Sequence, residues 1–212
     1  MIKITLLSIL FVLGCCSDKH KPNVQKVDIS SKKNVFNKIS ADTLEVDMTQ
    51  SKILWKGTKM RGAGKHEGTV QLKDAYILIE GEMIVGGKFT VDLRTIEVTD
   101  IPEHETVPRN RLKDHLKSTD FFDVKSYPFA HFEISQVIPL TSDSIKVMGN
   151  LAIKGITKAI EFSAWRSEKI FKTKFTFDRF QWDIAYKGSW VDKTLVDKEI
   201  QLKIKLMTQP FI

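Results

Sequence analysis

The chain has 212 residues and a net charge of +7, from 33 lysines and arginines against 26 acidic residues. Its composition is 42% hydrophobic, and the roughly 170 residues after a polar N-terminal stretch are enough for one domain with a sizeable core. No cysteine occurs after residue 16, which excludes a disulfide framework. The positive excess suits anionic lipid headgroups or simple solubility, and nucleic acid is not an expected partner because the lysines alternate along strands.

The N-terminus predicts an export signal. Lys3 precedes an apolar run whose length, about ten residues, is half of the roughly 20 that a spanning helix needs. Val12-Leu13-Gly14-Cys15 resembles the bacterial lipobox, in which the cysteine is acylated and becomes the new N-terminus. We therefore expect a lipoprotein signal peptide over 1–14 and lipidation at Cys15. The alternative is an ordinary signal peptide in which both cysteines are incidental.

Residues 15–43 are rich in Lys, Ser, Asn and Asp, a composition that cannot bury enough surface to order itself. We expect this segment to be a flexible, lipidated polar tether, followed by one domain over 44–212. Acyl chains contribute about 0.8 kcal/mol per buried methylene, so the anchor would attach the domain stably to a membrane. The expected location is the bacterial cell envelope, facing the periplasm or the cell surface.

Alternation with period two predicts strands through most of the domain. In the N-terminal half they cover 52–59, 66–72, 75–80 and 82–98, the last bending at Gly86-Gly87. In the C-terminal half one strand begins after Pro128, and others cover 145–153, 160–163, 171–177 and 200–206. Gly149 falls on an apolar face, where a bulge or a close backbone approach would explain it. Lys154-Gly155 predicts a hairpin turn.

One short helix is predicted over Arg109–Lys117. Leu112 and Leu116 lie four residues apart on one face, and Pro108 suits the first helical position. The following Phe121-Phe122 pair is either a gate to a ligand site or a hydrophobic corner that fastens the helix to the sheet, and we favour the corner.

About eight evenly spaced antiparallel strands with one helix predict an all-β fold, and a closed barrel in preference to two packed sheets. A barrel of eight strands either fills itself with side chains or holds one slender ligand. The residue pattern leaves both open.

Five segments occur in an order and spacing that point to a family. They are Trp55-Lys-Gly-Thr-Lys59 with Gly64-Lys-His66-Glu-Gly68, then Gly86-Gly-Lys-Phe89-Thr-Val-Asp-Leu93, the stretch from Asn110 to Phe162, Phe177-Asp178-Arg179-Phe-Gln-Trp182, and Val196-Asp-Lys-Glu-Ile200. Together they resemble the YceI-like family of lipocalin-like, isoprenoid-binding barrels, over most of the chain after Leu44. The acylated cysteine and long tether depart from the family's ordinary periplasmic members.

The resemblance implies an extended lipocalin-like antiparallel β-barrel that binds a polyisoprenoid, an isoprenoid quinone or a similar long-chain lipid, without catalysis or a cofactor. Members are commonly exported and some are dimers, so a homodimer is a further implied partner. The alternative is a structural or interaction lipoprotein with a filled barrel and no ligand. The candidate cavity wall consists of the inward-facing residues Phe89, Val91, Leu93, Phe132, Ile134, Val147, Leu151, Ile160, Phe162, Phe175, Phe177, Trp182, Leu202 and Ile204.

Arg179 is the candidate contact for a pyrophosphate or carbonyl headgroup, because its planar guanidinium suits such oxygens. A structural ion pair with Asp178 is the plainer alternative. The histidines lack metal-binding spacings, and the chain has no nucleophile elbow, phosphate loop or dinucleotide fingerprint. We therefore expect no metal site and no enzyme; an enzyme that uses Arg179 and a histidine on a lipid headgroup is the remote alternative.

Overall fold

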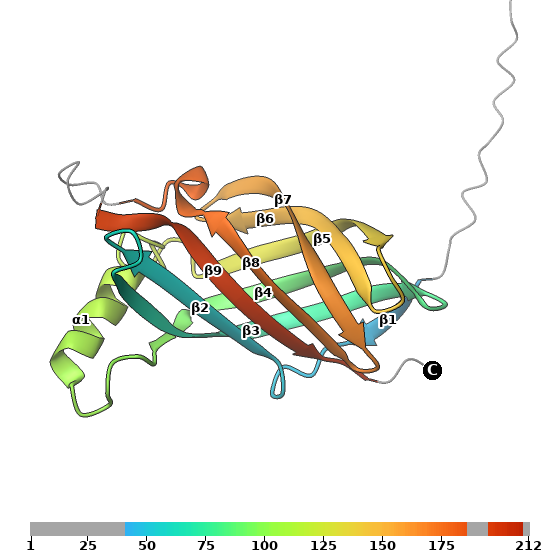
Figure 1. Cartoon of the computed structure of the whole chain (residues 1–212), viewed down its shortest axis with the longest axis horizontal. Coiled ribbons are helices and arrows are strands. Elements are labelled where there is room, and N and C mark those ends of the chain that lie inside the picture. The colour runs from blue at the N-terminus through green and yellow to red at the C-terminus, as the bar shows by residue number, and fades with distance from the viewer. Residues whose placement is uncertain (1–40, 186–194, 210–212) are drawn as a thin grey trace, which may run out of the picture. The chain divides into compact units, whose positions relative to one another are not determined.

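The structure is a computed structural model that describes residues 41–185 and 195–209 (Figure 1). The predicted leader, Cys15 and nearly all of the tether lie outside the described residues. The elements, in chain order, are β1 (Asp42–Glu45), β2 (Lys52–Lys59), β3 (Gly64–Glu80), β4 (Met83–Val98), α1 (Thr106–Lys117), β5 (Phe129–Pro139), β6 (Ser144–Ile153), β7 (Ile156–Ser167), β8 (Ile170–Asp178), the 3-10 helix η1 (Arg179–Trp182) and β9 (Val196–Met207).

The sheet closes on itself. Neighbouring strands pair antiparallel in the order β2-β9-β8-β7-β6-β5-β4, and β3 completes the circle by pairing with both β2 and β4. The short β1 adds to the free side of β3, where Leu44 lies opposite Ile77. The predicted all-β fold, a closed antiparallel barrel of eight strands with one helix, is therefore confirmed. Closure pairs strand edges that would otherwise be exposed.

β3 is one strand where the alternation predicts two. Lys73-Asp74 interrupts the apolar periodicity, and the pairing of β3 with β4 shifts between Leu72 and Asp74. Hydrogen bonding to β4 continues beyond this bulge, so the two predicted pieces belong to one strand. A further shift between Leu78 and Ile79 lies opposite Gly86, where the sequence predicts a bend.

Gly149 confirms the predicted close approach. It faces Ile134 on β5, next to a register shift between Ile134 and Gln136. A Cβ atom at this position would lie 2.5 Å from the carbonyl oxygen of Glu133 and 2.5 Å from the ring of Phe132. Only glycine fits here without moving the neighbouring strand.

Helix α1 begins at Thr106, three residues before the predicted start, and Pro108 lies third in it. Proline is tolerated there because the N–H groups of the first turn have no partner within the helix. Leu116 is buried, as its spacing from Leu112 predicts. The helix covers the end of β4, and Figure 1 shows it at the end of the barrel opposite β1.

The core divides along the barrel. One cluster joins the α1 end to the middle and includes Ile96, Val98, Leu116 and Trp182. A smaller cluster lies near β1 and includes Ile77 and Phe171. The most deeply buried side chains belong to the first cluster or contact it, so the α1 end is the more tightly packed of the two.

Candidate functional site

An apolar cavity runs through the barrel. Its volume is about 210 Å³, and its lining reaches from Gly57 and Leu116 at the α1 end to Ile84 and Val137 at the other. Apart from Gly57, Lys172 and Thr173, every lining residue is hydrophobic. A space of this kind suits an apolar chain, since it offers almost no polar side chain to a ligand.

All of the candidate wall residues except Trp182 line this cavity. Alternation explains the agreement, because successive side chains of a strand point to opposite faces of the sheet. The cavity wall also includes residues of the first strands that were not singled out from the sequence. They are Ile53, Trp55, Val70, Leu72, Ile77 and Ile84. The same period-two pattern in β2 and β3 was the signal that could have found all of these but Ile84, which lies in β4.

Trp182 supports the wall from behind. It is fully buried, its indole N–H donates to the carbonyl oxygen of Leu151 at 3.0 Å, and its ring meets Phe177 edge-on at 5.2 Å. It lies in η1, after β8 has ended, so the alternation of the strand does not extend to it. Its expected place on the wall is therefore wrong, although it packs against a residue that is there.

Arg179 lies in the closed end of the barrel and is absent from the cavity lining. Its side chain is fully buried and donates to the backbone carbonyl oxygens of Asp197 (3.1 Å), Ile184 (2.5 Å) and Val196 (2.8 Å). The guanidinium carbon also lies 5.8 Å from the centre of the Phe121 ring. These contacts tie η1 to the start of β9, so the expected headgroup contact does not match this geometry.

Asp197 connects this end of β9 to β2 and the turn that follows it. Its carboxylate accepts hydrogen bonds from the Thr58 hydroxyl at 2.5 Å and from the backbone N–H groups of Arg61 and Gly62, each at 3.0 Å. The Thr58 hydroxyl, the two N–H groups and the charge of Arg179 together lower the pKa of Asp197. Asp178 serves a different contact, since it caps η1 through the N–H of Phe180 and pairs with Lys198 at 3.6 Å.

Phe121 and Phe122 form a corner between α1 and the cavity. Phe121 is buried, meets His115 at 5.5 Å and Phe122 at 5.2 Å in edge-on geometry, and lines the cavity together with Leu116. Burial lowers the pKa of His115, against a smaller opposing effect of Asp120. These contacts support the fastening corner that the sequence favours.

The opposite end of the barrel carries a cleft of about 370 Å³. Ile84, Val137 and Ile145 line both this cleft and the interior cavity. The rest of the cleft is largely polar, and Arg166 donates to the carbonyl oxygen of Glu82 at 2.8 Å across it. Besides Arg166, the polar residues in its wall are Glu82, Ser135, Gln136, Thr141 and Ser142. Apolar interior and polar cleft therefore adjoin at this end.

The histidines make local polar contacts. His66 Nδ1 lies 2.9 Å from Asp100 Oδ2, and His131 Nδ1 lies 3.3 Å from the Thr90 hydroxyl. Within residues 41–185 and 195–209, no group of three or more His, Cys, Asp or Glu residues is placed to hold a metal ion. In the same part of the chain, no helix has the length and apolar character needed to cross a membrane.

Comparison with known proteins gives consistent matches. The model of the YceI-like domain matches residues 44–208. A UPF0312 protein of Vibrio campbellii is 25% identical over 142 residues, which span 61% of this chain and 75% of the relative. Another UPF0312 protein, from Azotobacter vinelandii, is 36% identical over 50 residues, which are 24% of this chain and 26% of that protein.

Solved structures share the fold. Burkholderia cenocepacia BcnA has a TM-score of 0.63 at 22% identity, and the match covers 78% of this chain and all of that one. The Campylobacter jejuni YceI protein has a TM-score of 0.51 at 19% identity, covering 66% of this chain and 84% of that one. The closed barrel, its apolar interior and the match over residues 44–208 lead to one conclusion: this chain belongs to the YceI-like domain family.

Proposed function

We propose that the barrel binds the tail of one long-chain amphiphile, such as a polyisoprenoid or an isoprenoid quinone, and carries it without changing it chemically. The observation that carries this proposal is the apolar cavity that extends through the barrel. Residues far apart on one strand, Ile84 and Ile96 of β4, both line it. A ligand that fills it is long and thin.

The hydrophobic effect supplies the affinity. Moving apolar surface from water into such a cavity is worth about 25 cal/mol per Å². The cavity volume of about 210 Å³ is small for so long a space, which favours a single flexible chain over a fused ring system. A ligand of this kind is nearly insoluble in water, so a protein that shields it has a clear use in a cell envelope.

The headgroup belongs in the cleft at the end remote from α1. The shared residues Ile84, Val137 and Ile145 are where a tail would leave the cavity. The hydroxyl, amide and guanidinium groups beyond them can donate to the oxygens of a headgroup, although the acidic Glu82 also lines the cleft. The cleft thus takes the role that the sequence suggested for Arg179.

The carrier is anchored in the envelope through an acyl group on Cys15, which the lipobox-like sequence supports. Replacement of Cys15 by Ser tests the anchor in cells that acylate lipoproteins. We expect the variant to leave the membrane fraction, and retention there at the wild-type level would rule out anchoring at this cysteine.

Solvent extraction tests the binding function. The purified full-length protein is extracted with organic solvent, the extract is analysed by mass spectrometry, and the emptied protein is then offered prenyl lipids. We expect a long-chain species in the extract or stoichiometric uptake of an added prenyl lipid. Failure of both would favour the alternative of an envelope protein whose barrel carries no ligand.

A further inference from the structure

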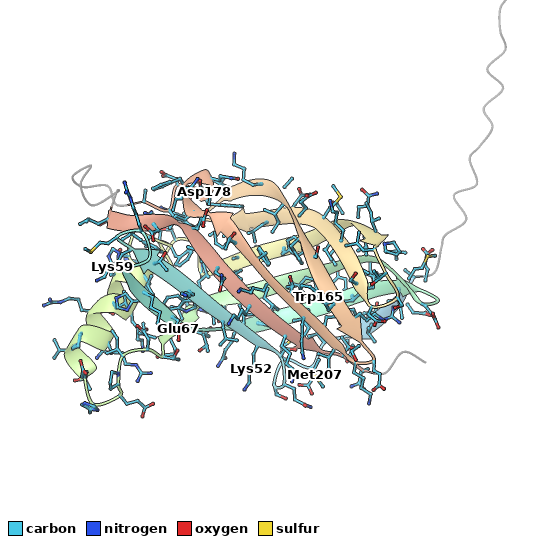
Figure 2. The ribbon with its side chains drawn as sticks, viewed as in Figure 1. Lys52, Lys59, Glu67, Trp165, Asp178 and Met207 are labelled. Carbon is cyan, nitrogen blue, oxygen red and sulfur yellow. The ribbon has the colours of Figure 1, made fainter. Side chains whose placement is uncertain are left out.

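Five lysines gather on the outer face of β2, β9 and β8. They are cross-strand neighbours: Lys205 of β9 lies opposite Lys52 of β2 on one side and opposite Lys172 of β8 on the other. In the next row, Lys203 lies opposite Lys174. We call these five residues the lysine face. Lys52, labelled in Figure 2, is the first residue of β2 and lies at the end of that strand remote from α1, and the pairing places the other four beside it.

The lysine face has no carboxylate to balance it. Among residues 41–185 and 195–209, none of the five lysines forms an ion pair. Like charges directly opposite one another on adjacent strands are destabilising. Away from this face, two strand lysines do have carboxylate partners, with Lys88 3.9 Å from Glu133 and Lys146 3.4 Å from Glu161. The unbalanced face therefore favours an anionic partner.

Two exposed apolar side chains belong to the same surface. Trp165 is 54% exposed and lies directly opposite Lys172, at the end of the row that contains Lys205 and Lys52. Leu54 is 44% exposed and lies opposite Lys203. Tryptophan with lysine is the combination found where proteins meet the interface between lipid and water, because the indole is amphipathic and the ammonium meets phosphate.

The lysine face adjoins the proposed ligand site. Pairing between β7 and β8 covers only the rows from Ala164–Thr173 to Ser167–Ile170. Thr173, which follows the outward-facing Lys172 at this junction, lines the interior cavity, and Arg166 of the polar cleft is the neighbour of Trp165 in the sequence. A membrane bound to the lysine face would therefore lie close to the cleft end of the barrel.

We propose that the lysine face, with Trp165 and Leu54, docks on an anionic phospholipid bilayer. The biological role of this docking rests on the proposed function, because a carrier of an insoluble lipid has to contact the membrane that supplies or receives that lipid. The evidence for docking is independent of that function, since it comes from the outer surface of the barrel. An acidic protein would match the charge alone, but it would not account for Trp165 at the end of the lysine row.

The test compares two variants with the same change in charge. In the first, Lys172, Lys174, Lys203 and Lys205 are each replaced by Gln; in the control, the exposed Lys88, Lys125 and Lys158 and the partly exposed Lys146 are replaced in the same way. Both are made in full-length protein that carries Cys15→Ser, so acylation adds no membrane affinity. Binding is measured by co-sedimentation with phosphatidylcholine vesicles, with and without about one third phosphatidylglycerol.

We expect the lysine-face variant to lose at least about tenfold in affinity for the anionic vesicles, since each lysine near such a surface is worth roughly fivefold. The control should stay within about threefold of the parent, and the parent should weaken as salt is raised. Equal losses in both variants, or equal binding to neutral vesicles, would overturn the proposal.

Trp165→Phe gives a second readout. We expect the blue shift of tryptophan fluorescence on anionic vesicles to shrink in this variant, and an unchanged shift would count against the docking geometry. Lipid extracted from the lysine-face variant separates the two proposals. Normal lipid content in a lysine-face variant that has lost vesicle binding supports docking and lipid binding together, whereas a parent protein that binds vesicles but holds no lipid supports docking alone.

Discussion

The two ends of the barrel are built differently. At the α1 end, Arg179, Trp182 and Ile184 are fully buried, and the guanidinium of Arg179 donates to the backbone carbonyl oxygen of Ile184 and to two carbonyl oxygens of β9. At the other end, aliphatic side chains such as Ile84 and Val137 separate the cavity from a polar cleft. Opening the first end breaks hydrogen bonds of a buried charged group, whereas the side chains between the cavity and the cleft at the second end, Ile84, Val137 and Ile145, are aliphatic and form no hydrogen bonds. We therefore infer that a ligand enters and leaves at the cleft end.

Arg179→Met should produce the largest effect, on stability. It leaves three carbonyl oxygens, one buried and two partly buried, without this donor, and we expect the free energy of unfolding to fall by about 3–5 kcal/mol. Lys198→Met, which changes an exposed neighbour, is the control, and urea denaturation measures both. If the Arg179→Met protein is instead as stable as the wild type but no longer holds lipid, Arg179 contacts the headgroup after all. The α1 end, and not the cleft end, would then be the end where the ligand enters.

Gly68→Ala tests how tightly the α1 end is packed. A Cβ atom at Gly68 would lie 1.8 Å from the carbonyl oxygen of Glu97 and 2.7 Å from the ring of Trp55. We expect a loss of about 2–4 kcal/mol, because β3 has to move away from β4. Gly57→Ala is a matched control, since nothing lies within 4 Å of its Cβ position. Equal thermal stability of the two variants would show that this end is looser than the structure indicates.

Arg166→Leu tests the cleft end through binding. The guanidinium can form charge-assisted hydrogen bonds to an anionic headgroup, so we expect affinity for a long-chain prenyl phosphate to fall about tenfold, or roughly 1.4 kcal/mol. Affinity for the corresponding prenol should change less than about twofold, because only the tail is then bound by the cavity. Arg94→Leu, at an exposed arginine paired with Asp92, is the control. Equal losses for both lipids would place the headgroup elsewhere.

His115 should make the α1 end slightly sensitive to acid, the smallest effect of the four. Burial holds its pKa below the ordinary value of 6.5, so the unfolded chain binds the proton more readily than the folded protein. Stability therefore falls as the pH drops through about 6.5, and the loss is complete below the folded-state pKa. His115→Gln should flatten this part of the profile, as followed by urea midpoints. A midpoint that rises on acidification in the wild type but not in the variant would contradict the assignment.

The sequence predicted the wall of the barrel well and its ends poorly. A strand with one buried face fixes which side chains point inward, so Phe132, Leu151 and Leu202 could be placed on the cavity wall from alternation. The partners of Arg179 are backbone carbonyls, which leave no mark in residue types. Whether the barrel is filled or hollow depends on how closely the inward side chains pack across it. The identity of the inward residues alone does not determine that packing.

The central claim, that the hollow interior holds a lipid tail, is tested most directly by two alanines of β7. Ala164 is buried on the cavity wall, whereas Ala159 is exposed on the outer face of the same strand. We measure the molar ratio of bound prenyl lipid to protein for Ala164→Phe and Ala159→Phe after loading. The claim predicts a ratio near that of the wild type for Ala159→Phe and a severalfold lower one for folded Ala164→Phe. Equal ratios for the two would contradict it.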